Sequence, residues 1–332
     1  MTSEVLVAVE GADAPRVPSS CMTPAISPSS PLTPGAKALG ALAVAGLVIA
    51  FSLSSTLAKR AETPGVLLAF WRMATVAIVW NVYLWSAGRH VTMTHLRQAA
   101  VPGVFLGLNL AAFFTGVTRN SVVNAALIGS LSPFLIVPLG ARLFGEHHDR
   151  RALVLALVAF SGVGVVLADA PPLGDASLPG NVFGMLAMLL WVSYVVSTRH
   201  FRRDMDVSIF MATVTPIATL AVLPLAVAHG DMFGMSGTGW TYMLLLASLI
   251  GVAGHALMVF AQRTIQIGTI GIAQVVQPAL AVVWAFLLLG ERLRDWQLIG
   301  VATALSGLLA FLLLNQRGSG TPRTEEPAAG AR

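Results

Sequence analysis

The chain has 332 residues, of which 56% are hydrophobic and only 11% are charged, and its formal net charge is +5. Because soluble domains carry about 25% charged residues, this composition excludes a soluble globular protein and indicates an integral membrane protein. The basic residues stand in short segments between apolar stretches, which is typical of a topology signal and not of nucleic acid binding. The single cysteine, Cys21, excludes a disulfide within the chain.

The two ends differ in composition from the body of the chain. Residues 1–35 are rich in Ser, Pro, Thr and Ala, and residues 316–332 read similarly, so we predict two disordered tails. The first apolar run, at 5–9, is short, is flanked by acids and lacks a basic start, which argues against a signal peptide. We therefore expect the first long apolar helix to act as the insertion signal and to remain in the protein.

Between the tails lie ten apolar stretches long enough to cross the hydrocarbon layer of a bilayer, which takes about 20 residues of helix. Prolines inside several of them are tolerated in membrane helices, where neighbouring groups satisfy the freed carbonyls. The sequence thus predicts an all-α integral membrane protein with ten transmembrane helices. The predicted spans are 36–57, 65–87, 99–118, 121–144, 152–168, 181–197, 208–228, 240–261, 268–289 and 296–314.

The second half of this body repeats landmarks of the first half. Pro133, Gly145 and Glu146 recur 145 residues later as Pro278, Gly290 and Glu291, and Ser161-Gly162 recurs as Ser306-Gly307. We therefore predict two repeats of five helices each, at 36–169 and 179–315. Five is an odd number, so the second repeat enters the membrane from the opposite face, and inverted repeats of this kind enclose a central cavity that opens alternately to each side.

The distribution of Lys and Arg predicts the orientation of the chain. With the N-terminus inside, the cytoplasmic segments hold 14 Lys and Arg and the outer segments hold 5, while Arg72 alone lies within a span. The positive-inside rule therefore places both termini in the cytoplasm and the protein in the cell (inner or plasma) membrane.

The paired Pro and Glu positions, each pair separated by 12 residues, occur together with Phe70-Trp71-Arg72 in the second span. This pattern resembles EamA-type transporters of the drug/metabolite transporter superfamily, and the likeness extends over about residues 36–314. The resemblance implies ten helices in two repeats, with a cavity lined mainly by the first, third, fourth, sixth, eighth and ninth spans. It also implies that the fifth and tenth spans serve packing or a homodimer, and that the cargo is a small metabolite, often exported.

Polar residues inside the spans are the candidate substrate contacts, because a polar group in hydrocarbon is costly unless it faces a cavity or a partner. Arg72 either reaches the interface or neighbouring carbonyls, or binds an anion such as a carboxylate. His255 is either a neutral hydrogen-bonded imidazole or a proton carrier, although no intramembrane Asp or Glu accompanies it.

Two helices supply a matched pair of polar positions. Ser132-Pro133 aligns with Gln277-Pro278 at the repeat offset, and each proline frees a carbonyl and can act as a hinge. These side chains either join helices or line the cavity, and Trp191 with Tyr194 forms a stripe that either packs or binds a cation. The expected substrate-binding residues are Arg72, Asn109, Asn124, Ser132, Trp191, Tyr194, His255, Gln274 and Gln277, and the expected structural or hinge residues are Pro133, Glu146, Pro278 and Glu291.

These patterns predict a secondary active transporter of an amino acid, a nucleobase or a drug-like compound, exporting by alternating access, with proton coupling left open. A passive facilitator or exchanger is the alternative within the same class, and a membrane sensor or scaffold is the alternative outside it. The spans show no cluster of acids, histidines or nucleophiles for an enzyme, and no cofactor is expected. Glu146 and Glu291 are expected to anchor the adjacent loops, and His147-His148 lacks the spacing of a metal site.

Overall fold

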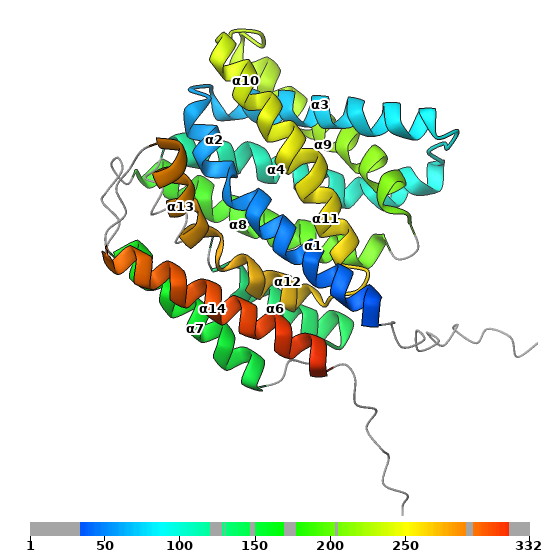
Figure 1. Ribbon diagram of the computed structural model, residues 1–332. Coiled ribbons are helices and arrows are strands. Elements are labelled where there is room, and N and C mark those ends of the chain that lie inside the picture. Colours follow the sequence, from blue (N-terminus) through cyan, green and yellow to red (C-terminus); the bar gives the residue numbers. More distant parts are fainter. Residues whose placement is uncertain are drawn as a thin grey trace, which may run out of the picture. The chain divides into compact units, whose positions relative to one another are not determined.

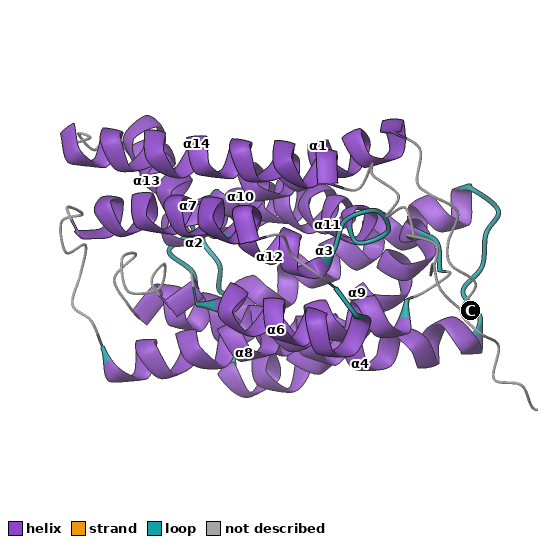
Figure 2. Cartoon of the chain, turned by 90° about the horizontal axis from the view of Figure 1, so that it is seen from below, coloured by secondary structure: helices purple, strands orange, loops and turns teal. Residues whose placement is uncertain are grey.

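The computed structural model describes residues 34–119, 128–129, 131–146, 150–168, 177–202, 205–289 and 295–318, and all regular structure in these ranges is helical (Figures 1 and 2). These described residues belong to one compact unit. The helices are α1 (Pro34–Ser52), α2 (Ser54–Arg60), α3 (Gly65–Ser86), α4 (Met93–Arg119), α6 (Ser132–Phe144), α7 (Arg150–Ala168), α8 (Leu178–Phe201), α9 (Val207–His229), α10 (Gly237–Leu245), the π-helix η1 (Leu246–Gly254), α11 (His255–Ala261), α12 (Ile267–Gln274), α13 (Gln277–Leu289) and α14 (Asp295–Gly318).

Seven helical segments of the described residues are long and apolar enough to cross a membrane. They are Ala38–Arg60, Gly65–Ser86, Met93–Arg119, Leu178–Phe201, Val207–His229, Gly237–Ala261 and Ile267–Leu288, and shorter apolar helices cover Ser132–Phe144, Leu153–Gly162 and Leu298–Phe311. The prediction of an all-helical, multi-pass membrane protein is therefore confirmed. The predicted tails, and the first residues of the predicted span 121–144, lie outside the described residues.

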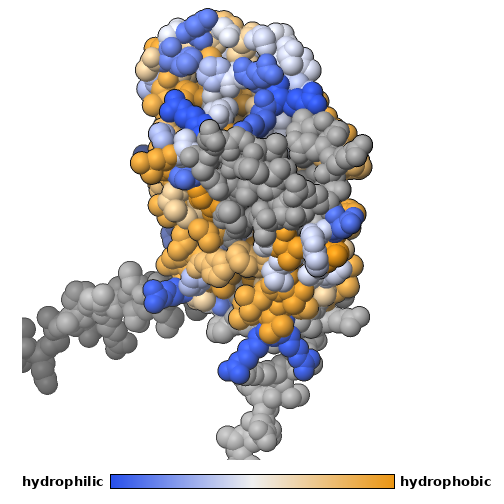
Figure 3. Space-filling model, turned by 90° about the vertical axis from the view of Figure 1, so that its left-hand side faces the viewer, coloured by the Kyte–Doolittle hydropathy of each residue, from blue (hydrophilic) through white to orange (hydrophobic). Residues whose placement is uncertain are grey.

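The surface of the helices is apolar where it faces outward. Leu42 is 68% exposed, Trp85 76% and Leu178 78%, and Figure 3 shows hydrophobic residues over much of one described face. In water, so large an exposed hydrophobic surface would promote aggregation. They are the expected contact surface for lipid.

Helix packing follows a regular scheme. Helix α4 packs on α8 and α9, α3 on α9, α6 on α12, and α7 on α14, while α1 packs on η1 and α11 (Figure 1). The α7–α14 contact is close because both helices carry a glycine there. A Cβ added to Gly162 would lie 2.5 Å from the Ala304 nitrogen, and one added to Gly307 would lie 2.8 Å from the Ala159 nitrogen.

Helix ends are set by ordinary capping chemistry. The α9 N-cap, Asp206, accepts hydrogen bonds from the Ser208 amide at 3.0 Å and hydroxyl at 3.1 Å, and its carboxylate lies 3.5 Å from Arg89. Partial burial raises the pKa of Asp206, but these hydrogen bonds and the charge of Arg89 outweigh it. The pKa of Asp206 therefore lies below its ordinary value.

Candidate functional site

A cavity of about 190 Å³ lies inside the helix bundle, between the junction of α1 and α2, α3, α4, α8, the η1–α11 segment and the junction of α12 and α13. This volume would hold on the order of six water molecules at liquid density. The polar side chains that line it are Ser52, Ser54, Ser55, Arg72, Asn109, Ser132, Trp191, His255, Gln274 and Gln277.

The cavity lies where helices are interrupted. Helix α1 ends at Ser52 and α2 begins at Ser54, while α12 ends at Gln274 and α13 begins at Gln277. Pro278 lacks an amide hydrogen and cannot continue the α12 hydrogen-bond ladder, so the chain turns through 275–276 with the tighter bonds from the Val275 amide to the Ile272 carbonyl and from the Val276 amide to the Ala273 carbonyl. Interruptions of this kind leave backbone and hydroxyl groups facing the cavity.

Seven of the nine predicted substrate-binding residues line the cavity, namely Arg72, Asn109, Ser132, Trp191, His255, Gln274 and Gln277. The predicted hinge Pro278 also lines it. Tyr194 is fully buried but does not line the cavity, and the same holds for the buried Pro133. Asn124 and Glu291 lie outside the described residues. The role of each residue in binding stays a prediction.

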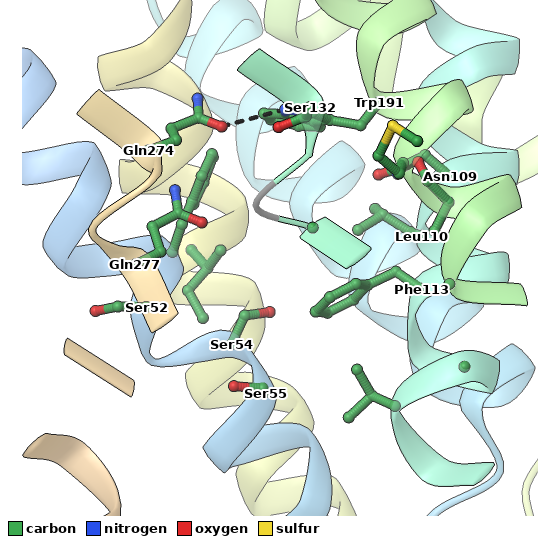
Figure 4. A pocket seen from close by; sticks show the side chains of 18 of the residues that line it. Ser52, Ser54, Ser55, Asn109, Leu110, Phe113, Ser132, Trp191, Gln274 and Gln277 are labelled. Carbon is green, nitrogen blue, oxygen red and sulfur yellow. Dashed lines mark hydrogen bonds between the residues drawn. The ribbon is translucent and has the colours of Figure 1, made fainter. Parts of the chain in front are cut away.

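The two walls of the cavity are polar in different ways (Figure 4). On one wall, the Gln274 and Gln277 side-chain nitrogens have no hydrogen-bond partner, and the Gln274 oxygen accepts from Trp191 Nε1 at 3.2 Å across the cavity. On the other wall, Asn109 donates to the Ala187 carbonyl at 2.7 Å, so this amide is used in joining α4 to α8. The nitrogens of the two glutamines are therefore buried donors in the cavity wall that lack a partner.

Arg72 is the charged side chain of the cavity. It is only 1% exposed, and neither its Nε nor its Nη2 has a hydrogen-bond partner. Its Cζ lies 5.4 Å from the ring centre of Phe114. None of the described residues that line the cavity is acidic, so the guanidinium is without a counter-charge there.

An aromatic group borders the cavity beside these amides. The His255 ring centre lies 5.0 Å from that of Phe51, 6.2 Å from that of Trp191 and 6.0 Å from that of Tyr194. His255 Nδ1 is buried without a hydrogen-bond partner. In the predicted stripe, Trp191 therefore lines the cavity, whereas Tyr194 packs against the neighbouring rings.

The family resemblance implied that the first span lines the cavity, but no individual residue of that span was predicted. Phe51, Ser52, Ser54 and Ser55 all line the cavity. The available signal was the hydroxyl-rich run Ser52–Thr56 inside an otherwise apolar stretch. Trp284 Nε1 donates to Ser52 Oγ at 2.7 Å, so a residue of α13 contacts the chain beside this interruption.

A polar stripe continues along α8 from the cavity toward the end of that helix. Tyr194, Thr198 and Arg202 stand four residues apart, so they share one face of α8, and all three are buried. Arg199 of the same helix donates to the Gln262 carbonyl, and both polar side-chain atoms of Gln262 lack a partner, as do Arg202 Nε and Nη1. Burial and, next, the charge of Arg263 lower the pKa of Arg202 to about 10.

Glu146 joins the two halves of the chain at the same end of the bundle. Gly145 adopts a left-handed φ of 65° after α6, which turns Glu146 back over the helix. The buried carboxylate accepts hydrogen bonds from the Ile267 amide at 2.9 Å and the Gly268 amide at 3.0 Å. It therefore caps the N-terminus of α12, a partner far from the adjacent loop that was expected.

No group of three or more His, Cys, Asp or Glu side chains in the described residues is placed to hold a metal ion. His147 and His148 lie outside these residues. The site therefore consists of amides, hydroxyls, aromatic rings and one guanidinium.

An all-helical multi-pass bundle around a central cavity with polar side chains in its wall is the architecture expected of a membrane transporter. Residues 38–168 and 178–313 each match the sequence model of the EamA-like transporter family, and the chain belongs to that family. The family is described as one of transporters, and this agrees with the family resemblance of the sequence.

Similar proteins include named and unnamed transporters. An uncharacterized transporter of Synechocystis is 24% identical over 65% of this chain, and the match spans 63% of that protein. The pseudopaline exporter of Pseudomonas aeruginosa is 26% identical over 64% of this chain and 73% of its own, and a riboflavin transporter of Brucella anthropi is 21% identical over 59% and 70%. A solved crystal structure of a protein superposes with a TM-score of 0.66 at 21% identity, covering 85% of this chain and 99% of that one, and it shares the fold.

Proposed function

We propose that the protein is a secondary transporter that exports a small organic metabolite across the cell membrane by alternating access. The observation that carries this proposal is the central cavity, which lies at interrupted helices contributed by both halves of the chain. Two similar proteins named as an exporter and a vitamin transporter support a metabolite as cargo.

The packing scheme supports ten spans in two inverted five-helix repeats. Exchanging each span with its counterpart in the other repeat turns the α4–α8 contact into the contact of α1 with η1 and α11, and leaves the α3–α9 and α7–α14 contacts unchanged. Gly162 against Ala304 and Gly307 against Ala159 are likewise the same contact after a shift of 145 residues. Such reciprocity is the mark of an approximate two-fold axis.

The distribution of basic residues supports cytoplasmic termini. Asp149 and Arg294 are equivalent positions of the two repeats, 145 residues apart. Single cysteines at these positions, in a Cys21→Ser chain, should react with a membrane-impermeant maleimide from opposite faces of the membrane. Labelling of both from the same face would contradict inverted repeats.

The state seen in the structure supports a cavity that is closed toward the cytoplasm. With the proposed orientation, the buried stripe of Tyr194, Thr198 and Arg202 lies between the cavity and the cytoplasm, and Glu146 ties α6 to α12 at that end. Unpartnered polar atoms in this stripe are costly when dry. In the opposite state of the cycle, water entering from the cytoplasm would satisfy them.

Flux measurements test the transport proposal. Proteoliposomes loaded with a metabolite mixture should lose one class of compound, and Gln277→Ala should slow this loss because it removes a free amide from the cavity wall. If every compound is lost no faster than from protein-free liposomes, the result would favour a membrane sensor or scaffold. Proton coupling, suggested by His255 at the cavity, requires that an imposed pH gradient change the flux, whereas unchanged flux would indicate a passive facilitator or exchanger.

Pairing of two copies is a further part of the proposal. Helices α7 and α14 present exposed leucines, including Leu157 at 61% and Leu309 at 60%. A second copy would cover these side chains, and native mass spectrometry of the detergent-solubilised protein distinguishes a dimer from a monomer.

A further inference from the structure

We propose that the cargo of this cavity carries a carboxylate, which binds the Arg72 guanidinium. This inference rests on the proposed transport function and narrows its substrate class to organic anions. It starts from the fact that Arg72 lines the cavity, is 1% exposed and has two unpartnered nitrogens.

The two unpartnered atoms are the pair that a carboxylate needs. Nε and Nη2 lie on one edge of the planar guanidinium, and their N–H bonds point in nearly the same direction. Two carboxylate oxygens can therefore accept from this edge at once, in the bidentate geometry typical of arginine. A chloride ion or a single hydroxyl satisfies only one of the two directions well.

The surroundings leave this charge uncompensated. A buried cation is costly unless it is paired and hydrogen-bonded. The described surroundings of Arg72 offer the face of Phe114 at 5.4 Å, a weak cation–π contact, and no acidic residue lines the described cavity. A carboxylate entering the cavity supplies both the missing charge and the missing acceptors.

The remaining lining favours an anion with an apolar, planar part. The titratable side chains on the cavity wall are Arg72 and His255, and neither carries a negative charge. The Phe51 and Trp191 rings form an apolar surface, with ring centres 5.7 Å apart. Both rings line the cavity and offer apolar surface to a hydrocarbon group, and the free nitrogens of Gln274 and Gln277 add donors and no acceptor.

Access to the guanidinium edge requires a small rearrangement. Nε and Nη2 are shielded from solvent, while other parts of the side chain reach the cavity wall. Arg72 must therefore turn its edge toward the cavity as the ligand enters. Since no hydrogen bond holds Nε or Nη2, this rotation breaks none at these atoms.

Three probes of similar size and different charge test the inference. The purified protein is titrated with 3-phenylpropanoate, 3-phenylpropanamide and 3-phenylpropylamine, and binding is read from thermal unfolding and from tryptophan fluorescence. We expect the carboxylate to bind at least tenfold more tightly than the amide and the amine, and Arg72→Gln to abolish this difference. Sodium chloride at equal concentration should not reproduce the effect.

The chain offers a matched control. Arg119 also lies over a phenylalanine, with its Cζ 5.6 Å from the Phe183 ring centre, but it lies at the exposed end of α4 and does not line the cavity. Arg119→Gln removes the same charge and should leave the carboxylate preference unchanged. Arg72→Lys keeps the positive charge but lacks the bidentate guanidinium edge, so it should retain only part of the preference for the carboxylate probe.

A purely structural role for Arg72 predicts different results. In that case Arg72→Met would lower the unfolding temperature of the empty protein, whereas an uncompensated charge predicts an equal or higher unfolding temperature. The unfolding temperature of Arg72→Met therefore distinguishes a structural role from an uncompensated charge even if Arg72→Gln folds poorly. Equal binding of the three probes, no binding of any, or a preference that survives in Arg72→Gln would overturn the inference.

Failure of this inference can be told apart from failure of the transport proposal. If proteoliposomes move neutral or cationic metabolites and no acid, transport stands and the carboxylate site is wrong. If the carboxylate binds through Arg72 while no compound crosses the membrane, the site stands and transport is wrong.

Discussion

Replacement of Glu146 tests the link between the two halves of the chain. Its buried carboxylate accepts two backbone hydrogen bonds, from Ile267 at 2.9 Å and Gly268 at 3.0 Å. Hydrogen bonds to a charged group contribute about 1.5–3 kcal/mol each, so Glu146→Ala should lower the free energy of unfolding by about 3–6 kcal/mol if no water replaces the carboxylate. Glu146→Gln retains one acceptor oxygen and should lose about half as much.

A neighbouring glycine gives a second route to the same perturbation. A Cβ added to Gly140 would lie 2.6 Å from Glu146 Oε2, the atom that accepts from Gly268. Gly140→Ala should therefore displace the carboxylate and cost about as much as one of its hydrogen bonds, about 1.5–3 kcal/mol.

Equilibrium unfolding in SDS, followed by tryptophan fluorescence, measures these differences. The control is Asp295→Asn, which removes an exposed carboxylate from the first turn of α14 and should cost about 0.3–1 kcal/mol. A Glu146→Ala loss no larger than that of the control would refute the reasoning, because it would mean that the α12 N-terminus does not depend on this cap.

Two further predictions concern packing and pH. Gly162→Ala and Gly307→Ala should each destabilise the protein by about 1–3 kcal/mol through overpacking, because each added Cβ meets the backbone of the facing helix. The control is Gly164→Ala, whose added Cβ has nothing within 4 Å and should not destabilise the protein. A large difference between the effects of Gly162→Ala and Gly307→Ala would contradict the two-fold packing. The lowered pKa of Asp206 means that the folded state binds this proton more weakly than the unfolded state, so its contribution to stability is present above pH about 4 and is lost as pH falls further. Unfolding temperatures from pH 7 to 3 should therefore decline less in Asp206→Asn than in the unchanged chain, and parallel curves would rule out this contribution.

The helices could be predicted from the sequence because hydrophobic length and local punctuation set them. Pro64 precedes α3, which begins at Gly65 as predicted, and Gly230 follows α9 with a φ of 100°. The cavity-lining residues Arg72, His255 and Gln277 could be selected because a polar side chain in hydrocarbon is costly unless it faces a cavity or a polar partner.

The interruption between α12 and α13 was predicted from Pro278, but the one between α1 and α2 could not be read from the sequence in the same way. Pro102 lies inside the continuous helix α4, whereas α1 ends just before Leu53, which is no helix breaker. Beside the break at Leu53, Trp284 donates to the hydroxyl of Ser52, which lies 232 positions away in the sequence. Contacts over this distance are fixed by tertiary packing and leave no local pattern.

The partner of Glu146 was also beyond local reasoning. The recurrence of Gly-Glu at 145–146 and 290–291 indicated a shared structural role, and the left-handed Gly145 explains why glycine comes first. The carboxylate, however, binds amides 121 and 122 positions away, in the other half of the chain. The sequence repeat indicates that Glu146 has a structural role, but it does not identify the residues that Glu146 contacts.

Alternating access is tested most directly by labelling one cysteine on each side of the cavity. Ser55→Cys and Thr198→Cys are placed separately in a Cys21→Ser chain, with and without Glu146→Ala, and a membrane-impermeant maleimide is applied from each face. Because Glu146 holds the cytoplasmic end closed in the proposed orientation, its loss should shift the population toward the inward-open state. We predict faster labelling of Thr198→Cys from the cytoplasm together with slower labelling of Ser55→Cys from outside, and a simultaneous rise at both positions, or a change at only one, would contradict the account.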